Sequence, residues 1–405
     1  MALPTLPRIV CPSVIAGAGL IVPVSFGLPG PQESPPEAQV TRDAPGAPEV
    51  VWEFDAGDYR FSEVIAGFGM VFALDRQGKI HGLDGTEGDL LWSTGGKESM
   101  SYSFGFAILD RPDLKAVVVA CDAGLLALDP KTGGEIWRTE IELGVAGPAC
   151  AKETIVAASS DGHVYGFRPT TGKILWKHGY MSDAPEDPPG FDGRRARFEG
   201  RPARPKGAVT DGKTVAVSIF DQCRTIAVDA LTGERLWSFR TLGWVSGPAS
   251  FGADHVFIPS QDKHLYAVDK VTGELRWKVQ TRGRVSRGGT QSGGTVFFGS
   301  CDARLYAVDV ASGEVAWEFE TEHEEGRGAP IYSLPVVQDG QVHLAAMRGK
   351  VYSVDAKTGG LLWKFEPVAK SEINSELIAA GDRFFLTTRV DIDGAGESTV
   401  IAFSR

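Results

Sequence analysis

Cysteine is scarce in this sequence, and the few that occur are not spaced as a metal site requires. The chain has 5 cysteines in 405 residues, with no adjacent pair and no CxxC pair. We therefore predict no structural zinc and no disulfide framework, and expect the cysteines to be buried or turn residues that behave as small apolar groups. Histidine is also sparse, with 7 scattered residues, so no metal site is predicted.

Positive charge is in deficit, and asparagine is almost missing. The chain has 41 Lys and Arg against 52 Asp and Glu, a formal net charge of -11. A general nucleic-acid binder needs clustered cations that neutralise phosphates, so the sequence excludes that class. Asn374 is the sole asparagine. Nucleophile motifs, a Ser/His/Asp arrangement and a phosphate-binding glycine loop are also missing, which favours a protein without catalysis.

The N-terminal region differs in composition from the rest of the chain. Residues 9–28 are mostly apolar but are interrupted by two prolines. Two interpretations of residues 1–28 stay open, an export signal or membrane anchor and an unstructured cytoplasmic extension, of which we favour the first. Any membrane contact would run through residues 9–28. Residues 29–49 are rich in proline and are expected to form a semi-extended linker.

One pattern recurs along the remaining chain at intervals of about 40 residues. Seven copies place a glycine four residues after a reference position and a tryptophan eight residues after it. The tryptophans, with one additional copy at the front, are Trp52, Trp92, Trp137, Trp176, Trp237, Trp277, Trp317 and Trp363. The reference residue is aspartate in six copies, namely Asp84, Asp129, Asp229, Asp269, Asp309 and Asp355.

Each copy has the pattern of a β-hairpin preceded by two more strands. In residues 265–269, successive side chains alternate between two faces as in a strand that is packed on both sides. The aspartate at its end is followed by a short loop. Its carboxylate can hold that turn, and the glycine can adopt a positive φ. A sheet of four short strands cannot bury both faces by itself, so copies of this length indicate propeller blades stacked in a ring.

The two ends of the repeat region complement each other. After Trp363 the chain supplies three strands, whereas residues 50–54 form a lone tryptophan-bearing strand. Pairing the ends completes a blade and removes two exposed sheet edges. We therefore predict an all-β fold, an eight-bladed β-propeller over residues 50–405 with four antiparallel strands per blade. Its last blade is completed by the N-terminal strand, and an insertion lies at about residues 178–207.

The run Ala/Ser-Val-Asp-x-x-Thr-Gly-x-x-x-Trp resembles the repeat of the PQQ-like propeller family. That family includes quinoprotein dehydrogenases and the BamB family of β-barrel assembly lipoproteins. The resemblance covers residues 50–405 and implies that each tryptophan docks against the neighbouring blade. Departures at Glu87, Arg168 and Ser404 predict locally weaker hairpins. The residues before Cys11 also make a poor lipoprotein cleavage site.

The resemblance also bears on cofactors. Quinoprotein dehydrogenases typically carry an adjacent Cys-Cys pair and a Ca²⁺ held by Glu, Asn and Asp. This chain has no Cys-Cys pair and only Asn374 as an asparagine. We therefore expect neither PQQ nor calcium, and predict no other cofactor.

Candidate functional residues lie in the loops between blades. In propellers, these loops and the turns between the second and third strands form one face that usually carries function. Candidates there for a polar central funnel are Arg60, Tyr102, Trp244, Arg284, Arg287, Arg327, Glu372 and Asn374. They are interpreted either as solvated loop charge, which we favour, or as a polar pocket for an acidic or hydroxylated ligand.

The insertion at residues 178–207 is interpreted either as a flexible loop or as a partner-docking lid. For the whole chain we predict a monomeric binding or scaffold protein that presents its loops and central funnel to a protein partner or a small ligand. Two alternatives stay open, an enzyme of unknown class that uses the funnel and, less favoured, a PQQ-dependent oxidoreductase.

Overall fold

The computed structural model describes residues 48–55, 61–75, 77–95, 105–180, 189, 203–324, 327–373, 375–392 and 395–404. They belong to one compact unit spanning Ala38–Arg405. The N-terminal segment 1–28 and most of the linker 29–49 lie outside the described residues. None of the described helices is long and apolar enough to cross a membrane.

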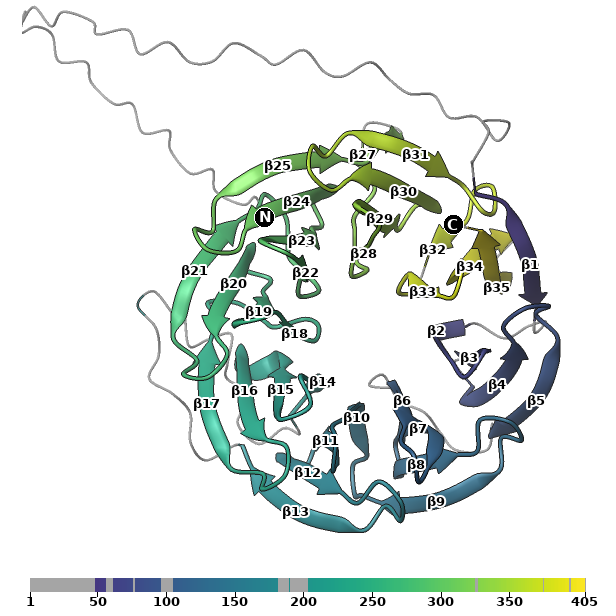
Figure 1. Cartoon of the computed structure of the whole chain (residues 1–405), viewed down its shortest axis with the longest axis vertical. Coiled ribbons are helices and arrows are strands. Elements are labelled where there is room, and N and C mark those ends of the chain that lie inside the picture. The colour runs from purple at the N-terminus through teal and green to yellow at the C-terminus, as the bar shows by residue number, and fades with distance from the viewer. Residues whose placement is uncertain are drawn as a thin grey trace, which may run out of the picture. The chain divides into compact units, whose positions relative to one another are not determined.

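The described strands form a ring of eight blades, with each blade's first strand innermost and its last strand on the outside (Figure 1). Blade 1 contains β2 (Phe61–Gly67), β3 (Met70–Asp75), β4 (Lys79–Asp84) and β5 (Leu90–Gly95). Blade 2 contains β6 (Phe106–Asp110), β7 (Lys115–Cys121), β8 (Gly124–Leu128) and β9 (Glu135–Glu140). Blade 3 contains β10 (Val145–Cys150), β11 (Ile155–Ser159), β12 (His163–Phe167) and β13 (Ile174–Gly179). Blade 4 contains β14 (Pro205–Thr210), β15 (Thr214–Ile219), β16 (Arg224–Asp229) and β17 (Arg235–Arg240), with the short 3-10 helix η2 (Phe220–Gln222) between its middle strands.

The second half of the ring repeats this plan. Blade 5 contains β18 (Ser250–Phe251), β19 (His255–Pro259), β20 (His264–Asp269) and β21 (Leu275–Gln280). Blade 6 contains β22 (Thr290–Ser292), β23 (Thr295–Gly299), β24 (Arg304–Asp309) and β25 (Val315–Glu320). Blade 7 contains β28 (Val336–Gln338), β29 (Gln341–Ala346), β30 (Lys350–Asp355) and β31 (Leu361–Phe365), preceded by the hairpin β26 (His323–Glu324) and β27 (Arg327–Gly328). Blade 8 contains β33 (Ile378–Ala380), β34 (Arg383–Ile392), β35 (Ala395–Ser404) and β1 (Val50–Asp55), with β32 (Glu372–Ile373) also paired to β34.

The predicted ring closure is confirmed by the pairing of β1 with β35. The two strands run antiparallel, with Trp52 opposite Ala402. Beyond the end of the ladder, the backbone N–H of Ser404 donates to the carbonyl of Glu49 at 2.8 Å, and the hydroxyl of Ser404 accepts from the N–H of Glu49 at 2.8 Å. The departure from the repeat at Ser404 therefore serves the closure itself.

The hydrophobic core lies in layers between neighbouring blades. In one layer Phe257 and Leu265 of blade 5 pack with Phe298 and Tyr306 of blade 6. The middle strands are buried on both faces because a blade lies on each side of them. Burial of apolar surface between blades is therefore what holds the ring together.

The tryptophans dock against the neighbouring blade, as the resemblance implied. The indole of Trp277 donates to the carbonyl of Val310 at 2.7 Å in the next hairpin. Its ring also covers Gly313, where φ is +75° and an added Cβ would lie 2.7 Å from the indole. Glycine at this position thus meets two demands, the left-handed backbone and the close approach of the ring. Equivalent bonds are made by Trp52, Trp92, Trp137, Trp176, Trp237 and Trp317.

The repeated aspartates hold the hairpin turns. One carboxylate oxygen of Asp269 accepts the N–H groups of Val271 and Thr272 at 2.9 and 2.8 Å. A side-chain bond from Arg276 and these N–H groups lower the pKa of Asp269. In blade 3 Arg168 occupies this position, and its turn keeps the backbone bond from Gly172 to the Arg168 carbonyl at 2.9 Å.

Candidate functional site

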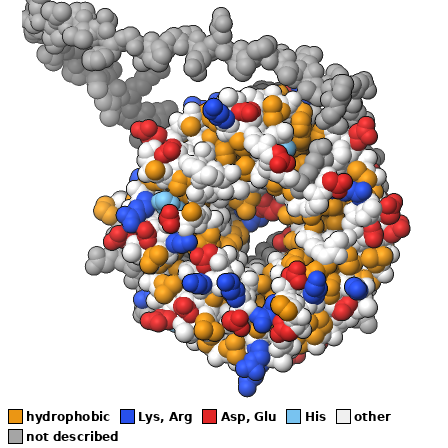
Figure 2. Space-filling model, viewed as in Figure 1, with side chains coloured by type: hydrophobic (Ala, Val, Ile, Leu, Met, Phe, Trp, Pro, Cys, Tyr) orange, Lys and Arg blue, Asp and Glu red, His pale blue; other side chains and the backbone are white. Residues whose placement is uncertain are grey.

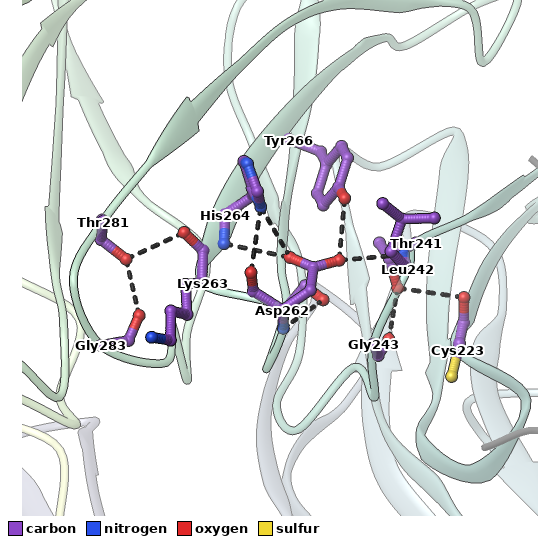
Figure 3. A network of polar contacts seen from close by, with 11 residues as sticks. Cys223, Thr241, Leu242, Gly243, Asp262, Lys263, His264, Tyr266, Thr281 and Gly283 are labelled. Atoms are coloured by element: carbon purple, nitrogen blue, oxygen red, sulfur yellow. Dashed lines mark hydrogen bonds and ion pairs between the residues drawn. The ribbon is translucent and has the colours of Figure 1, made fainter. Parts of the chain in front are cut away.

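The loops that connect successive blades lie on one face of the ring, the loop face, and polar side chains hold these loops in place. Asp262, in the turn between β19 and β20, accepts the N–H of His264 with one carboxylate oxygen at 3.1 Å. The other oxygen accepts the hydroxyl of Tyr266 at 2.8 Å and the N–H of Leu242 at 2.9 Å (Figure 3). Because Leu242 lies in the incoming linker, this aspartate ties the linker to the turn of the same blade.

Hydrogen bonds from a threonine also link the turn between β19 and β20 to the loop that leads to the next blade. The hydroxyl of Thr281 bonds to the carbonyls of Lys263 at 3.0 Å and Gly283 at 2.7 Å (Figure 3). Lys263 itself has φ of 73°, a left-handed conformation that the surrounding bonds must hold. These contacts make the loop face a fixed scaffold.

The sequence analysis missed this second aspartate of the blades. Asp302 in blade 6 bonds to Tyr306 at 2.8 Å, and Asp161 in blade 3 bonds to Tyr165. The signal was present as Ser-x-Asp-x-x-x-Tyr, which recurs from Ser159, Ser260 and Ser300. It marks the loop face, whereas the Asp–Gly–Trp pattern marks the opposite end of each blade.

Glycines bring the inner edges of neighbouring blades into close contact in three of the described pairs. A Cβ added to Gly105 would lie 2.4 Å from the Cα of Gly147, and one added to Gly147 would lie 2.9 Å from the Cα of Gly207. One added to Gly247 would lie 2.1 Å from the carbonyl of Ser286. On this side the ring is therefore closed by backbone packed against backbone, around the central hollow that Figure 2 shows.

Charged side chains occupy the other side of the ring's inner edge. Arg287 of blade 6 pairs with Glu376 of blade 8 at 2.6 Å, and the other oxygen of Glu376 accepts the N–H of Leu334 of blade 7 at 2.6 Å. Glu63 on β2 lies close enough to feel both charges, and the N–H of Phe106 donates to it. Burial raises the pKa of Glu63 to about 7, against the opposing effects of Arg287 and Phe106.

Replacing Glu63 with glutamine is expected to change how stability depends on pH. The folded-state pKa of Glu63 is raised from 4.5 to about 7, so the folded protein binds an extra proton between these values and loses stability as pH rises through that window. Glu63→Gln should therefore melt above the wild type at pH 8 and close to it at pH 5, as measured by differential scanning fluorimetry. Glu53→Gln, on the exposed outer strand, serves as the control. An equal shift at both pH values would contradict the role of Glu63.

A second cluster on the loop face combines aromatic rings with a cation. Trp244, in the linker before β18, lies 5.0 Å from Phe220 of η2 between ring centroids. The ammonium of Lys206 lies 5.1 Å from the centre of the Phe220 ring. Trp244 is partly exposed, and the N–H of Gln261 donates to its carbonyl at 2.9 Å.

Arg284 lies in the equivalent linker of the next blade. Its side chain is exposed, and its carbonyl accepts the N–H of Cys301 at 2.8 Å. Tyr332 lies beside both residues, and burial together with Cys301 raises the pKa of its phenol while Arg284 opposes that rise. Arg284 is thus on the predicted face, next to a phenol and a thiol.

The structure places the remaining predicted site residues in different ways. Arg60, Tyr102 and Asn374 lie outside the described residues. The backbone of Arg327 lies in β27, and Glu372 is exposed on β32, where it pairs in register with Arg389. The carboxylate that meets Arg287 is Glu376, which the sequence analysis did not single out.

The described carboxylates of the inner edge are held by other partners. Glu376 is occupied by Arg287 and a backbone N–H, and Glu63 receives the N–H of Phe106. Within the described residues, no three His, Cys, Asp or Glu side chains gather where one ion would reach them.

Comparison with known proteins gives a family match and several similar folds. The model of the family described as outer membrane protein assembly factor BamB matches residues 39–210 and 222–405. No curated protein matches in sequence. Among solved structures, BamB from Moraxella catarrhalis has a TM-score of 0.65 at 16% identity, covering 89% of this chain and 100% of that one. Quinohemoprotein alcohol dehydrogenase from Comamonas testosteroni has a TM-score of 0.64 at 12% identity, covering 88% and 76%. The computationally designed Ika8 protein has a TM-score of 0.68 at 16% identity, covering 88% and 99%.

Proposed function

Because the chain belongs to the family of the outer membrane protein assembly factor BamB, we propose that it is a protein-binding scaffold whose loop face docks a partner protein. The observation that supports this most directly is the cluster of Trp244, Phe220 and Lys206. Partly exposed tryptophan on a fixed backbone is typical of the residues that dominate binding at protein interfaces. The hydrogen bonds that Asp262 makes hold the loops in place before a partner binds, and so reduce the conformational entropy that is lost on docking.

The proposal extends to where the protein works. Assembly of outer membrane proteins takes place beyond the inner membrane, so a member that shares this role is exported. In this proposal residues 1–28 serve as the export signal or anchor, and the propeller follows the linker of residues 29–49.

Site-specific photo-crosslinking in the source cells tests the docking face. A benzophenone amino acid placed at Trp244 is expected to give discrete protein adducts, because the partner covers this side chain. The same label at Val271, which is 73% exposed in a hairpin turn at the opposite end of its blade, should give none. Adducts at Val271 alone, or at neither position, would overturn the proposed function.

A further inference from the structure

Lys206 is a cation that lacks a carboxylate partner in the described part of the chain. Its ammonium lies over the ring of Phe220, 5.1 Å from the ring centre. The side chain is only partly exposed. Burial and the nearby cations Arg204 and Arg287 lower the pKa of Lys206, whereas Asp221 opposes them. Asp221 is itself buried and accepts the N–H of Arg204 at 3.3 Å. Within the described residues, the ammonium of Lys206 therefore contacts an aromatic ring and forms no ion pair with a carboxylate.

The surroundings of Lys206 offer both apolar and polar contacts. The rings of Phe220 and Trp244 lie 5.0 Å apart between centroids and are tilted by 35°. In the linker that carries Trp244, burial alternates around the fully buried Val245, and both Trp244 and Ser246 are partly exposed. The hydroxyl of Ser246 is buried and has no hydrogen-bond partner among the described residues. A buried hydroxyl without a partner is costly unless a ligand or water satisfies it.

Ser246 is also the counterpart of Lys206 in the neighbouring blade. Each precedes the inner-edge glycine of its own blade, Gly207 and Gly247 respectively. An added Cβ at Gly207 would lie 3.3 Å from Pro248, the residue after Gly247. The two inner edges are therefore adjacent, and one ligand can address both blades.

We propose that Lys206 receives a side-chain carboxylate of the partner protein, with an apolar side chain next to that carboxylate packing on Phe220 and Trp244. The proposal rests on the proposed function and names the chemistry of its partner. A carboxylate accepts from an ammonium and from a hydroxyl, which are the donors that Lys206 and Ser246 present. The rings exclude water around the pair and so strengthen it.

A partner protein suits this site better than an anionic membrane surface. The cationic cluster is local, whereas the chain as a whole carries a net charge of -11. An extended anionic surface would be repelled by the net negative charge of the protein. A single carboxylate would interact mainly with the local positive charge around Lys206. The two rings of Phe220 and Trp244 also offer an apolar surface about as large as one side chain of a partner.

The test compares two capped tripeptides, Ac-Phe-Asp-Phe-NH2 and Ac-Phe-Asn-Phe-NH2, which differ in one charge. Binding to the full chain is followed by fluorine NMR of a fluorotryptophan placed only at Trp244. The aspartate peptide is expected to bind about tenfold more tightly, the effect of a charge-assisted bond. Lys206→Met keeps the apolar stem on Phe220 and should abolish the preference. Lys213→Met, an exposed lysine at the other end of the same blade, should retain it.

Three outcomes would overturn the proposal. They are equal affinity for the two peptides, a preference that survives Lys206→Met, and binding to phosphatidylglycerol vesicles that depends on Lys206 while neither peptide binds. Discrete crosslinks at Trp244 together with any of these results would leave the proposed scaffold function intact and remove only the carboxylate assignment.

Discussion

Replacing Trp277 with alanine is expected to lower the free energy of unfolding by about 3–5 kcal/mol, the range for removing a large buried side chain from a core. Trp277 is 9% exposed, bonds to the carbonyl of Val310 and covers Gly313 of the next blade. The variant therefore loses a contact between blades as well as buried surface. Urea denaturation followed by circular dichroism measures the change.

Two further variants make this result specific. Val271→Ala, at an exposed turn position of the same blade, should change the unfolding free energy by no more than about 0.5 kcal/mol. Gly313→Ala disrupts the same contact through its other partner. The loss of unfolding free energy in the double variant should therefore be smaller than the sum of the losses in Gly313→Ala and Trp277→Ala. If Trp277→Ala were as mild as Val271→Ala, the tryptophan would not be holding the blades together.

Removing residues 1–56 should destabilise the protein strongly, because it deletes β1 and leaves β35 as an exposed edge. The deletion takes away the ladder from Trp52 and Phe54 to Ala402 and Val400, and with it a buried tryptophan. We expect an effect at least as large as that of Trp277→Ala, accompanied by self-association through the new edge. Thermal melts and light scattering after size-exclusion chromatography measure the two effects.

Removing only residues 1–45 is the matched control for this deletion. It retains Glu49 and its bonds to Ser404, so the ring stays closed and the melting temperature should match that of the full chain. If the two truncated proteins melted alike, the closure by β1 would contribute nothing to stability.

Much of the fold was predictable because its determinants are local. A tryptophan in register on each outer strand, an aspartate at each hairpin and a glycine after it are set by strand alternation and turn chemistry. Counting the copies and comparing the two ends was then enough to predict the ring and its closure by β1, which the pairing of Trp52 with Ala402 confirms.

The site was less predictable, and the arginine pairing shows why. Loop position placed Arg287 on the loop face, but it did not indicate whether Glu372 or Glu376 would pair with it. That choice depends on how blades 6, 7 and 8 turn their inner edges toward one another. The Lys206 cluster likewise joins η2 and two different loops.

The number of blades, the hairpin turns and the closure of the ring could all be predicted from the sequence, since each follows from residues within one repeat or from the two chain ends. The three-dimensional fold was needed to show that Arg287 pairs with Glu376 and that Glu63 is crowded beside them. It was also needed to show that, among the described residues, Lys206 contacts an aromatic ring and forms no ion pair. The physical reason is that charge pairing acts across the centre of the ring. There, residues far apart in the chain come within a few ångströms, and burial in place of sequence spacing decides which charges are balanced.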